Sequence, residues 1–191
     1  MGPFSLERAA YAVEKVRNRL LKATAALEAG GVPYAVAGGH AVALWVSRVD
    51  EAAVRITRDV DLLIRRENFE AAKVALAAAG FVYRHVAGLD VFLDSPSAKP
   101  RDAVQIVFAG EKVRADEPLA NPDVSESQDA GLFRVLSLEA LVRIKLTAFR
   151  DKDRTHLRDM IEVALIDADW LGKLPAVLTS RLAQLLDSPG G

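Results

Sequence analysis

The chain has 191 residues, 51% of them hydrophobic and 27% charged, so it can bury one substantial core and does not have a disordered composition. The formal net charge of -1 excludes a strong global attraction to nucleic acid or to an anionic membrane. The absence of cysteine excludes a disulfide framework and a thiolate metal site. No apolar stretch approaches the roughly 20 residues that cross a bilayer, so we expect a soluble, cytoplasmic protein without a membrane partner.

Apolar residues recur at three- and four-residue steps from Ser5 to about Ala29, which predicts a long amphipathic helix. The Gly30-Gly31 pair is expected to end this helix. The pattern then predicts, in chain order, a strand over 33–37, a helix over 40–46, a strand over 57–64, a helix over 67–79, and strands over 81–86, 90–93 and 103–108. The expected fold is therefore α/β (α+β), with a small mixed β-sheet flanked by helices.

The chain divides by composition into three parts. Residues 1–110 hold the expected α/β core with its N-terminal helix. Between 111 and 135 periodicity vanishes and Pro, Asp, Asn, Ser and Glu accumulate, which predicts a connecting loop. Residues 136–187 form a C-terminal helical portion, in which two helices meet around the charged stretch 150–159 and a last helix runs over about 174–186.

Two carboxylates, Asp59 and Asp61, interrupt the apolar pattern of the strand expected over 57–64. Residues two apart in a strand point to the same face, so the two carboxylates would project side by side while Val60 faces the core. Such a pair repels itself unless a divalent cation relieves the repulsion, and hard oxygen ligands favour Mg²⁺ or Mn²⁺ and hence phosphate substrates. Alternatively, both side chains lie on the solvated face at the edge of the sheet.

Gly38 and Gly39 lie between the strand expected at 33–37 and the helix that follows it. Glycines at such a turn let the backbone N–H groups of the helix approach a phosphate closely. Alone, the pair fits a plain tight connection equally well. Combined with Asp59 and Asp61 on the next strand, it predicts a site for nucleotide phosphates. His40 begins the helix, where it would either touch phosphate or cap the turn as a half-buried histidine.

The segments Ala37–Leu44 and Thr57–Ile64 resemble the nucleotidyltransferases with a DNA polymerase beta-like fold, and within them the minimal and AbiEii-like toxin-type branch. The run Lys145–Asp159 is similar to the helical element in which that branch places a Lys and an Asp. The likeness covers about residues 33 to 165. It implies a nucleotidyltransferase-like core with a C-terminal helical portion.

The resemblance implies that a nucleoside monophosphate is transferred from a nucleoside triphosphate to a hydroxyl acceptor, with Mg²⁺ or Mn²⁺ as cofactor. The acceptor would be RNA or a protein side chain, and a cognate antitoxin is a further expected partner. Lys145 would contact phosphate, oriented by Asp153 or Asp159, although it also fits a solvated helix lysine. The other implied roles are metal binding for Asp59 and Asp61, and nucleotide binding for Gly38, Gly39, His40 and Arg58.

One position departs from the family pattern. Active members present a third carboxylate on a later strand, and Gln105 stands where that carboxylate aligns. A neutral amide cannot replace the charge. The side chain of Asp102 would point to the other face of the strand. Asp90 or Asp94 would supply the third carboxylate only under a different alignment. The alternative to an enzyme is therefore a catalytically degenerate module of the same fold that binds a nucleotide or a partner protein.

The basic residues of the C-terminal run permit two interpretations. They could line an RNA or nucleotide groove, or form a salt-bridged surface helix, because Asp151, Asp153 and Asp159 alternate with them. The basic residues concerned are Arg143, Lys145, Arg150, Lys152, Arg154 and Arg158.

Overall fold

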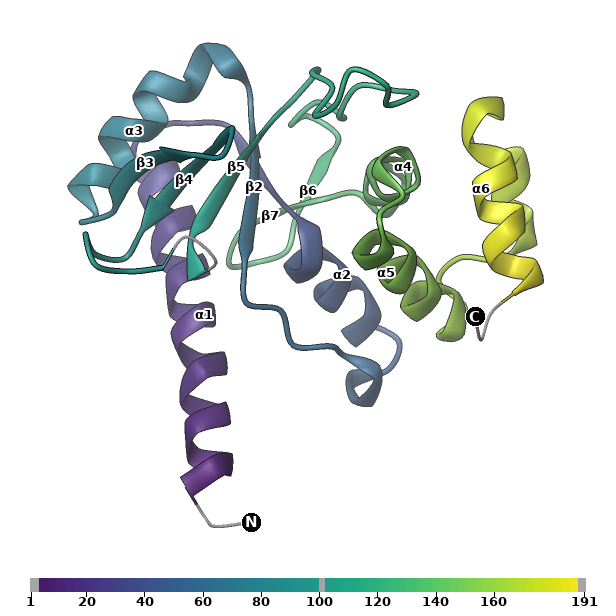
Figure 1. The fold of residues 1–191 in the computed structure, drawn as a ribbon, viewed down its shortest axis with the longest axis horizontal. Helices are drawn as coiled ribbons and strands as arrows, with labels where there is room; N and C mark the ends of the chain where they lie inside the picture. The colour runs from purple at the N-terminus through teal and green to yellow at the C-terminus, as the bar shows by residue number, and fades with distance from the viewer. Residues whose placement is uncertain (1–3, 100–101, 189–191) are drawn as a thin grey trace.

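The computed structural model describes residues 4–99 and 102–188, and its described strands form one mixed seven-stranded sheet (Figure 1). The strand order is β3-β4-β5-β2-β1-β7-β6. The central strand β2 runs antiparallel to β1 and parallel to β5. The strands are β1 (Tyr34–Ala37), β2 (Val60–Ile64), β3 (Val82–Val86), β4 (Leu89–Leu93), β5 (Val104–Phe108), β6 (Ser127–Asp129) and β7 (Arg134–Leu136).

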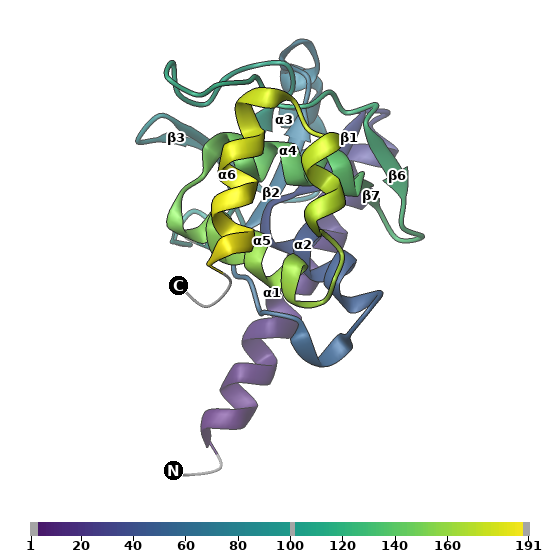
Figure 2. The ribbon, with the colours of Figure 1, turned by 90° about the vertical axis from the view of Figure 1, so that its right-hand side faces the viewer.

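The helices cover the two faces of the sheet. On one side α1 and α3 pack against each other, and on the other side α2, α4, α5 and α6 gather in contact with one another (Figures 1 and 2). The first half of α1 projects beyond the body of the molecule. The helices are α1 (Phe4–Ala29), α2 (Gly38–Ser47), α3 (Phe69–Ala78), α4 (Leu138–Ala148), α5 (Asp151–Glu162) and α6 (Ala176–Asp187), with short 3-10 turns at 51–53, 66–68 and 168–172.

Local sequence explains where these elements begin and end. Gly31 has a φ of 64° and ends α1, with the amide of Val32 donating to the carbonyl of Leu27, the bond pattern of a glycine-terminated helix. Leu62, Leu63 and Ile64 of β2 are fully buried, because this strand is covered on both faces. The charged residue of β2 is thus at its N-terminal end, where Asp61 stands close to Asp59, the residue just before the strand.

The expected fold class is confirmed: a mixed sheet flanked by helices, with a C-terminal helical portion. The expectation of a plain connecting loop over 111–135 is wrong in its last part. There β6 and β7 form a hairpin, and β7 lies parallel to β1 and extends the sheet. Three-residue strands are too short to show an alternating pattern, which is why periodicity does not reveal them. None of the helices in the described ranges is long and apolar enough to span a membrane.

Candidate active site

Asp59 and Asp61 open into the same cavity, although β2 begins one residue after Asp59. This cavity, here called the central cavity, has a volume of about 350 Å³ and lies between the sheet and the corner that joins α4 to α5. Both aspartates therefore line one cavity, although only Asp61 is part of the strand. The charged residues that line the central cavity are Asp59, Asp61, Glu117, Lys145, Arg150, Lys152 and Asp153.

Gly38 and Gly39 are required because neighbouring side chains leave no room for a Cβ atom, and Gly38 also because of its backbone conformation. Gly38 has a φ of 62°, and a Cβ built on it would lie 2.6 Å from Cγ of Asp61. A Cβ on Gly39 would lie 2.6 Å from Oγ1 and 2.8 Å from Cβ of Thr57. The N-terminus of α2 is thereby packed between the segment before β2 and the carboxylate of Asp61.

The electrostatics of Asp61 favour a bound cation. Burial raises the pKa of the Asp61 carboxyl above its ordinary value, and the nearby charge of Asp59 raises it further, against the opposing effect of Lys145 and Lys152. A carboxylate in this position is destabilised when it carries its charge. A positive ion in the central cavity would remove that penalty.

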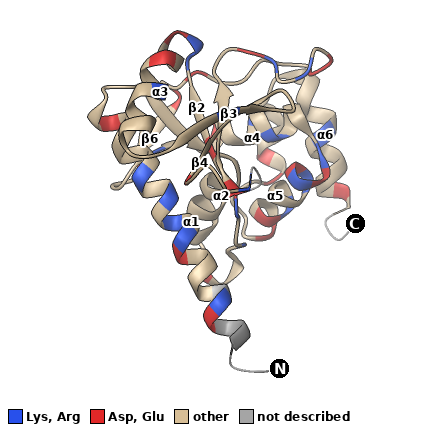
Figure 3. Cartoon of the chain, turned by 60° about the vertical axis from the view of Figure 1, so that its left-hand side comes forward, with Lys and Arg blue, Asp and Glu red and all other residues tan. Residues whose placement is uncertain are grey.

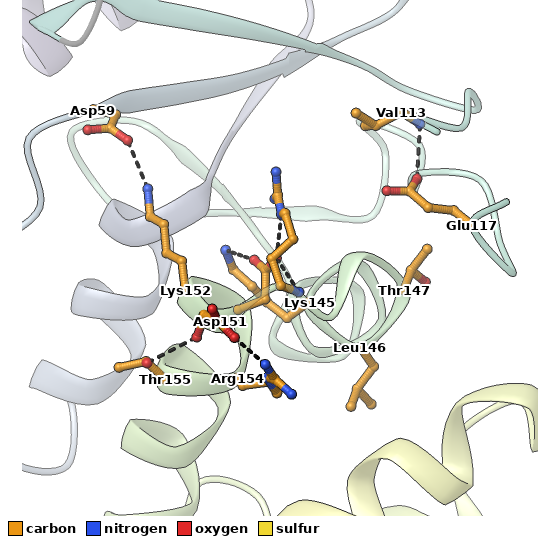
Figure 4. Close-up of polar contacts among 12 residues, drawn as sticks. Asp59, Val113, Glu117, Lys145, Leu146, Thr147, Asp151, Lys152, Arg154 and Thr155 are labelled. Carbon is orange, nitrogen blue, oxygen red and sulfur yellow. Dashed lines mark hydrogen bonds and ion pairs between the residues drawn. The ribbon is translucent and has the colours of Figure 1, made fainter. Parts of the chain in front are cut away.

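Two lysines reach the central cavity from the α4–α5 corner (Figure 4). Lys152 extends from α5 and its Nζ lies 2.8 Å from Oδ2 of Asp59. Lys145 comes from α4, is nearly fully buried, and its Nζ lies 3.0 Å from Oδ1 of Asp153. Asp153 also accepts a 2.8 Å hydrogen bond from Nε of Arg150 on its other oxygen.

Asp153 therefore holds two cations in place. Its carboxylate is 1% exposed, and burial alone would raise its pKa, but Lys145 and Arg150 outweigh burial and hold the pKa below the ordinary value. The geometry depends on Phe149, which ends α4 in the left-handed conformation at a φ of 48° and turns the chain directly into α5. A non-glycine residue in this conformation is strained, and such strain is concentrated at functional sites.

A second cavity of about 380 Å³ adjoins the first, here called the lateral cavity. It lies between α2, α5 and the segment before β2, and it shares Asp59 and Lys152 with the central cavity. Asp159 lines it and accepts hydrogen bonds of 2.7 and 2.8 Å from Nε of Arg55. The other polar residues of its wall are Thr57, Arg58, Thr155 and His156.

The structure distributes the predicted site residues between the two cavities, and one of them lies in neither. It brings Gly38, Asp59, Asp61 and Lys145 to the central cavity, and Gly39 and Arg58 to the lateral cavity. His40 lines neither cavity. Burial lowers the pKa of His40 to about 4, and its Nε2 has no hydrogen-bond partner among the described residues. Of the two aspartates considered for orienting Lys145, Asp153 contacts it, whereas Asp159 pairs with Arg55.

Gln105 stands beside Asp61 on the neighbouring strand, paired with it in the parallel register of β2 and β5. It lines the central cavity, and its alignment with the family's third carboxylate stays a prediction. The other acidic candidates are engaged elsewhere: Asp94 binds Arg19, and Asp90 accepts hydrogen bonds from Tyr83 and His85. Asp102 is not among the residues that line either cavity.

Three charged residues of the site have no individual signal in the sequence. Arg55 looks like an ordinary surface charge there, Lys152 stands out only as one of the six basic residues of the C-terminal run, and Glu117 belongs to the aperiodic segment. Glu117 is 8% exposed, lines the central cavity, and accepts a 3.0 Å hydrogen bond from the amide of Val113 (Figure 4). A buried carboxylate has no signature in an aperiodic stretch, so only the fold reveals it.

The basic residues of the C-terminal run are mostly paired with carboxylates, and basic and acidic segments alternate along α5 (Figure 3). Arg143 contacts Glu126, and Arg154 contacts Asp151 on the surface of α5. The run is therefore salt-bridged, as one interpretation expected, while Lys145, Arg150 and Lys152 also line the central cavity.

Comparison with known proteins gives likeness at the level of the fold. No family model and no curated protein matches the chain. The solution structure of the antibiotic-resistance factor ANT(2'')-Ia matches with a TM-score of 0.56 and 19% identity, over 92% of this chain and 95% of that one. The crystal structure of ANT(2'')-Ia in complex with adenylyl-2''-tobramycin matches with a TM-score of 0.48 and 19% identity, over 89% and 95%. JHP933 from Helicobacter pylori matches with a TM-score of 0.46 and 18% identity, over 95% and 75%.

The chain therefore has a nucleotidyltransferase-like fold. The expected resemblance is confirmed to that extent. The matches do not distinguish the AbiEii-like branch from other members of the fold.

Proposed function

We propose that the protein transfers a nucleoside monophosphate from a nucleoside triphosphate to a hydroxyl group. The observation that carries the proposal is the position of Asp59 and Asp61 beside the glycine turn: both line the central cavity, and Asp59 also lines the lateral cavity. A nucleotide has a nucleoside end and a polyphosphate end, and two adjoining cavities that share Asp59 fit such a molecule. Phosphoryl transfer depends mainly on positioning and electrostatic stabilisation, which this site can supply.

The residues present fit a Mg²⁺ or Mn²⁺ ion. Among residues 4–99 and 102–188 no group of three or more His, Asp or Glu is placed to hold a metal, so an all-protein cage is absent there. Mg²⁺ is commonly bound by one or two carboxylates together with substrate phosphates, which is the set that Asp59 and Asp61 offer. When bound, the ion would supply positive charge that offsets the charge developing on the phosphates.

The reaction would form a bond between the acceptor oxygen and the α-phosphorus and break the bond from that phosphorus to the bridging oxygen. Pyrophosphate leaves, and the hydroxyl proton passes to solvent or to a base. Lys145 and Arg150, both held by Asp153, present positive charge to the phosphates in the central cavity. The acceptor is proposed to be RNA or a protein side chain, and the activity to be that of a toxin with a cognate antitoxin, as the resemblance to the AbiEii-like branch suggests.

Calorimetric titration tests the proposal. Mg²⁺ and each nucleoside triphosphate would be titrated into the wild type and into an Asp59→Asn, Asp61→Asn double variant. A matched control is Asp167→Asn, Asp169→Asn, which removes two exposed carboxylates at the same spacing outside both cavities. We expect metal-dependent triphosphate binding in the wild type and the control and its loss in the double variant. Absence of such binding in the wild type would overturn the proposal.

A second candidate function is favoured by Gln105. Without a carboxylate beside Asp61, the chain could bind nucleotide, or a partner protein, without turning nucleotide over. This alternative predicts nucleotide binding that persists when Mg²⁺ is removed, and no pyrophosphate release. A Gln105→Asp variant separates the two: if only the variant releases pyrophosphate on incubation with triphosphate and acceptor, the wild type is the binding module.

A further inference from the structure

The segment between β5 and β6 begins with a closed loop over residues 110–121. Two backbone hydrogen bonds hold the ends of this loop together: the amide of Gly110 donates to the carbonyl of Asn121 at 3.1 Å, and the amide of Asn121 donates to the carbonyl of Glu111 at 2.8 Å. Nδ2 of Asn121 also donates to the carbonyl of Phe108, the last residue of β5, at 3.0 Å. Compact loops with closed ends are frequently functional. This loop is fixed at its base to the sheet, so it can hold a side chain in a defined place.

Glu117 is the side chain that this loop places in the central cavity. It is 8% exposed and lines the cavity. Its Oε2 accepts a 3.0 Å hydrogen bond from the amide of Val113, whereas its Oε1 accepts none from the described residues. Oε1 nevertheless keeps accessible surface, and Figure 4 shows it directed away from Val113, towards the side on which Lys145 and Lys152 lie. Buried carboxylate oxygens are normally satisfied by protein, water or a ligand, so Oε1 is open to a group in the cavity.

The other polar residues of the cavity narrow down what Oε1 can do. Among the described residues no group of three or more His, Asp or Glu is placed to hold a metal, so Glu117 does not join Asp59 and Asp61 as a metal ligand. Gln105, beside Asp61 on β5, is a neutral amide and cannot take a proton. Both oxygens of Asp153 are occupied by its two ion pairs. Outside the aspartate pair, Glu117 is therefore the carboxylate of the described cavity lining that has an oxygen to spare.

We propose that Glu117 is the base of the reaction: its Oε1 accepts a hydrogen bond from the acceptor hydroxyl and takes the proton as the acceptor oxygen attacks the α-phosphorus. This inference rests on the proposed function. The acceptor oxygen forms the new bond to phosphorus with the electron pair that the proton leaves behind. The bond from phosphorus to the bridging oxygen breaks, its electron pair departs with pyrophosphate, and Glu117 later passes the proton to solvent. The loop thus supplies a carboxylate that the strand position of Gln105 lacks.

Pyrophosphate release from each magnesium nucleoside triphosphate, with water as the acceptor hydroxyl, tests the inference. Glu117→Gln keeps an oxygen for the amide of Val113 but cannot take a proton. Asp116→Asn is the matched control, because Asp116 is an exposed neighbour on the same loop and lines neither cavity. We expect Glu117→Gln to lower the release rate about 100-fold or more, as loss of a positioned base does, and to leave the triphosphate affinity measured by calorimetry unchanged. Asp116→Asn should match the wild type in both measurements.

Chemical rescue separates a proton acceptor from a structural role. Glu117→Ala removes the carboxylate, and added formate, a small carboxylate, should restore part of its release rate without changing its triphosphate affinity. Formate should not change the rates of the wild type or of Glu117→Gln. Equal release by the wild type and Glu117→Gln, no effect of formate on Glu117→Ala, or a wild type that binds triphosphate and releases no pyrophosphate would overturn the inference while leaving triphosphate binding intact. Failure of the wild type to bind any triphosphate would instead overturn the proposed function.

Discussion

Gly38 lies directly against the carboxylate of Asp61. A Cβ on Gly38 would stand 2.6 Å from Cγ and 2.8 Å from Cβ of Asp61, and closer still to Oδ2. Ala37, the preceding residue, pairs with Asp61 across β1 and β2, so the two strands fix this contact. The glycine thus serves two purposes: it adopts a positive φ, and it leaves room for the carboxylate that faces the central cavity.

Substituting Gly38 by Ala should therefore displace Asp61 and abolish metal-dependent nucleotide binding. Gly88→Ala is the matched control, because Gly88 also has a positive φ, of 79°, and a Cβ added to it would meet no other atom within 4 Å. Gly88→Ala should cost about 1 kcal/mol for the left-handed backbone alone. Calorimetry measures the nucleotide binding and urea unfolding measures the stability. If Gly38→Ala and Gly88→Ala behaved alike in both measurements, the contact between Gly38 and Asp61 would be contradicted.

Asp153 should matter far more than its neighbour Asp151, although both lie in the first turn of α5. Asp153→Asn leaves Lys145 buried without its counter-charge, which should cost about 3 kcal/mol in the free energy of unfolding. Asp151→Asn removes a carboxylate that is 92% exposed and pairs with Arg154, so its effect on unfolding should be close to zero. If chemical denaturation gave the same midpoint for both variants, the ion pairs of Asp153 would not stabilise the corner that joins α4 to α5.

A second ion pair, in which the arginine is buried and the aspartate is partly exposed, ties α1 to the end of β4. Arg19 is 2% exposed and its Nη2 lies 2.5 Å from Oδ2 of Asp94. Asp94→Asn should destabilise the fold by about 3 kcal/mol, because it leaves a buried guanidinium without its partner. Since Asp94 lies outside the central cavity, nucleotide affinity of the folded variant should match that of the wild type. A selective loss of affinity without a change in unfolding would show that Asp94 belongs to the site.

Features of the site that depend only on neighbouring residues could be predicted from the sequence, whereas features that depend on the fold could not. The pair Asp59 and Asp61 and the turn at Gly38 are readable because strand alternation and strand-to-helix turns are short-range patterns. The partnership of Lys145 with Asp153 requires the left-handed turn at Phe149, a residue type that gives no signal for that conformation.

Contacts between segments that are distant in the sequence could not be predicted from it in the same way. Arg55 and Asp159 are 104 residues apart in sequence, and their contact exists only because α5 packs beside the segment before β2. Gln105 is intermediate: its alignment follows from the family resemblance, but its register with Asp61 requires the sheet. The roles of these residues in binding and catalysis stay predictions.

Two histidines, the buried His156 and the partly buried His40, should make the protein less stable in mild acid. Burial lowers the pKa of His40 and of His156 from 6.5 to about 4, so between these values the unfolded chain binds protons that the folded protein does not. Stability contributed by the neutral imidazoles is thus present above about pH 6.5 and is lost as the pH falls towards 4, by at most about 1.4 kcal/mol per pH unit for each histidine. Urea unfolding of the wild type and of a His40→Gln, His156→Asn variant, measured from pH 8 to pH 4.5, checks this. The variant should show the shallower decline between pH 6.5 and 4.5, and parallel curves would show that neither histidine is held neutral by the fold.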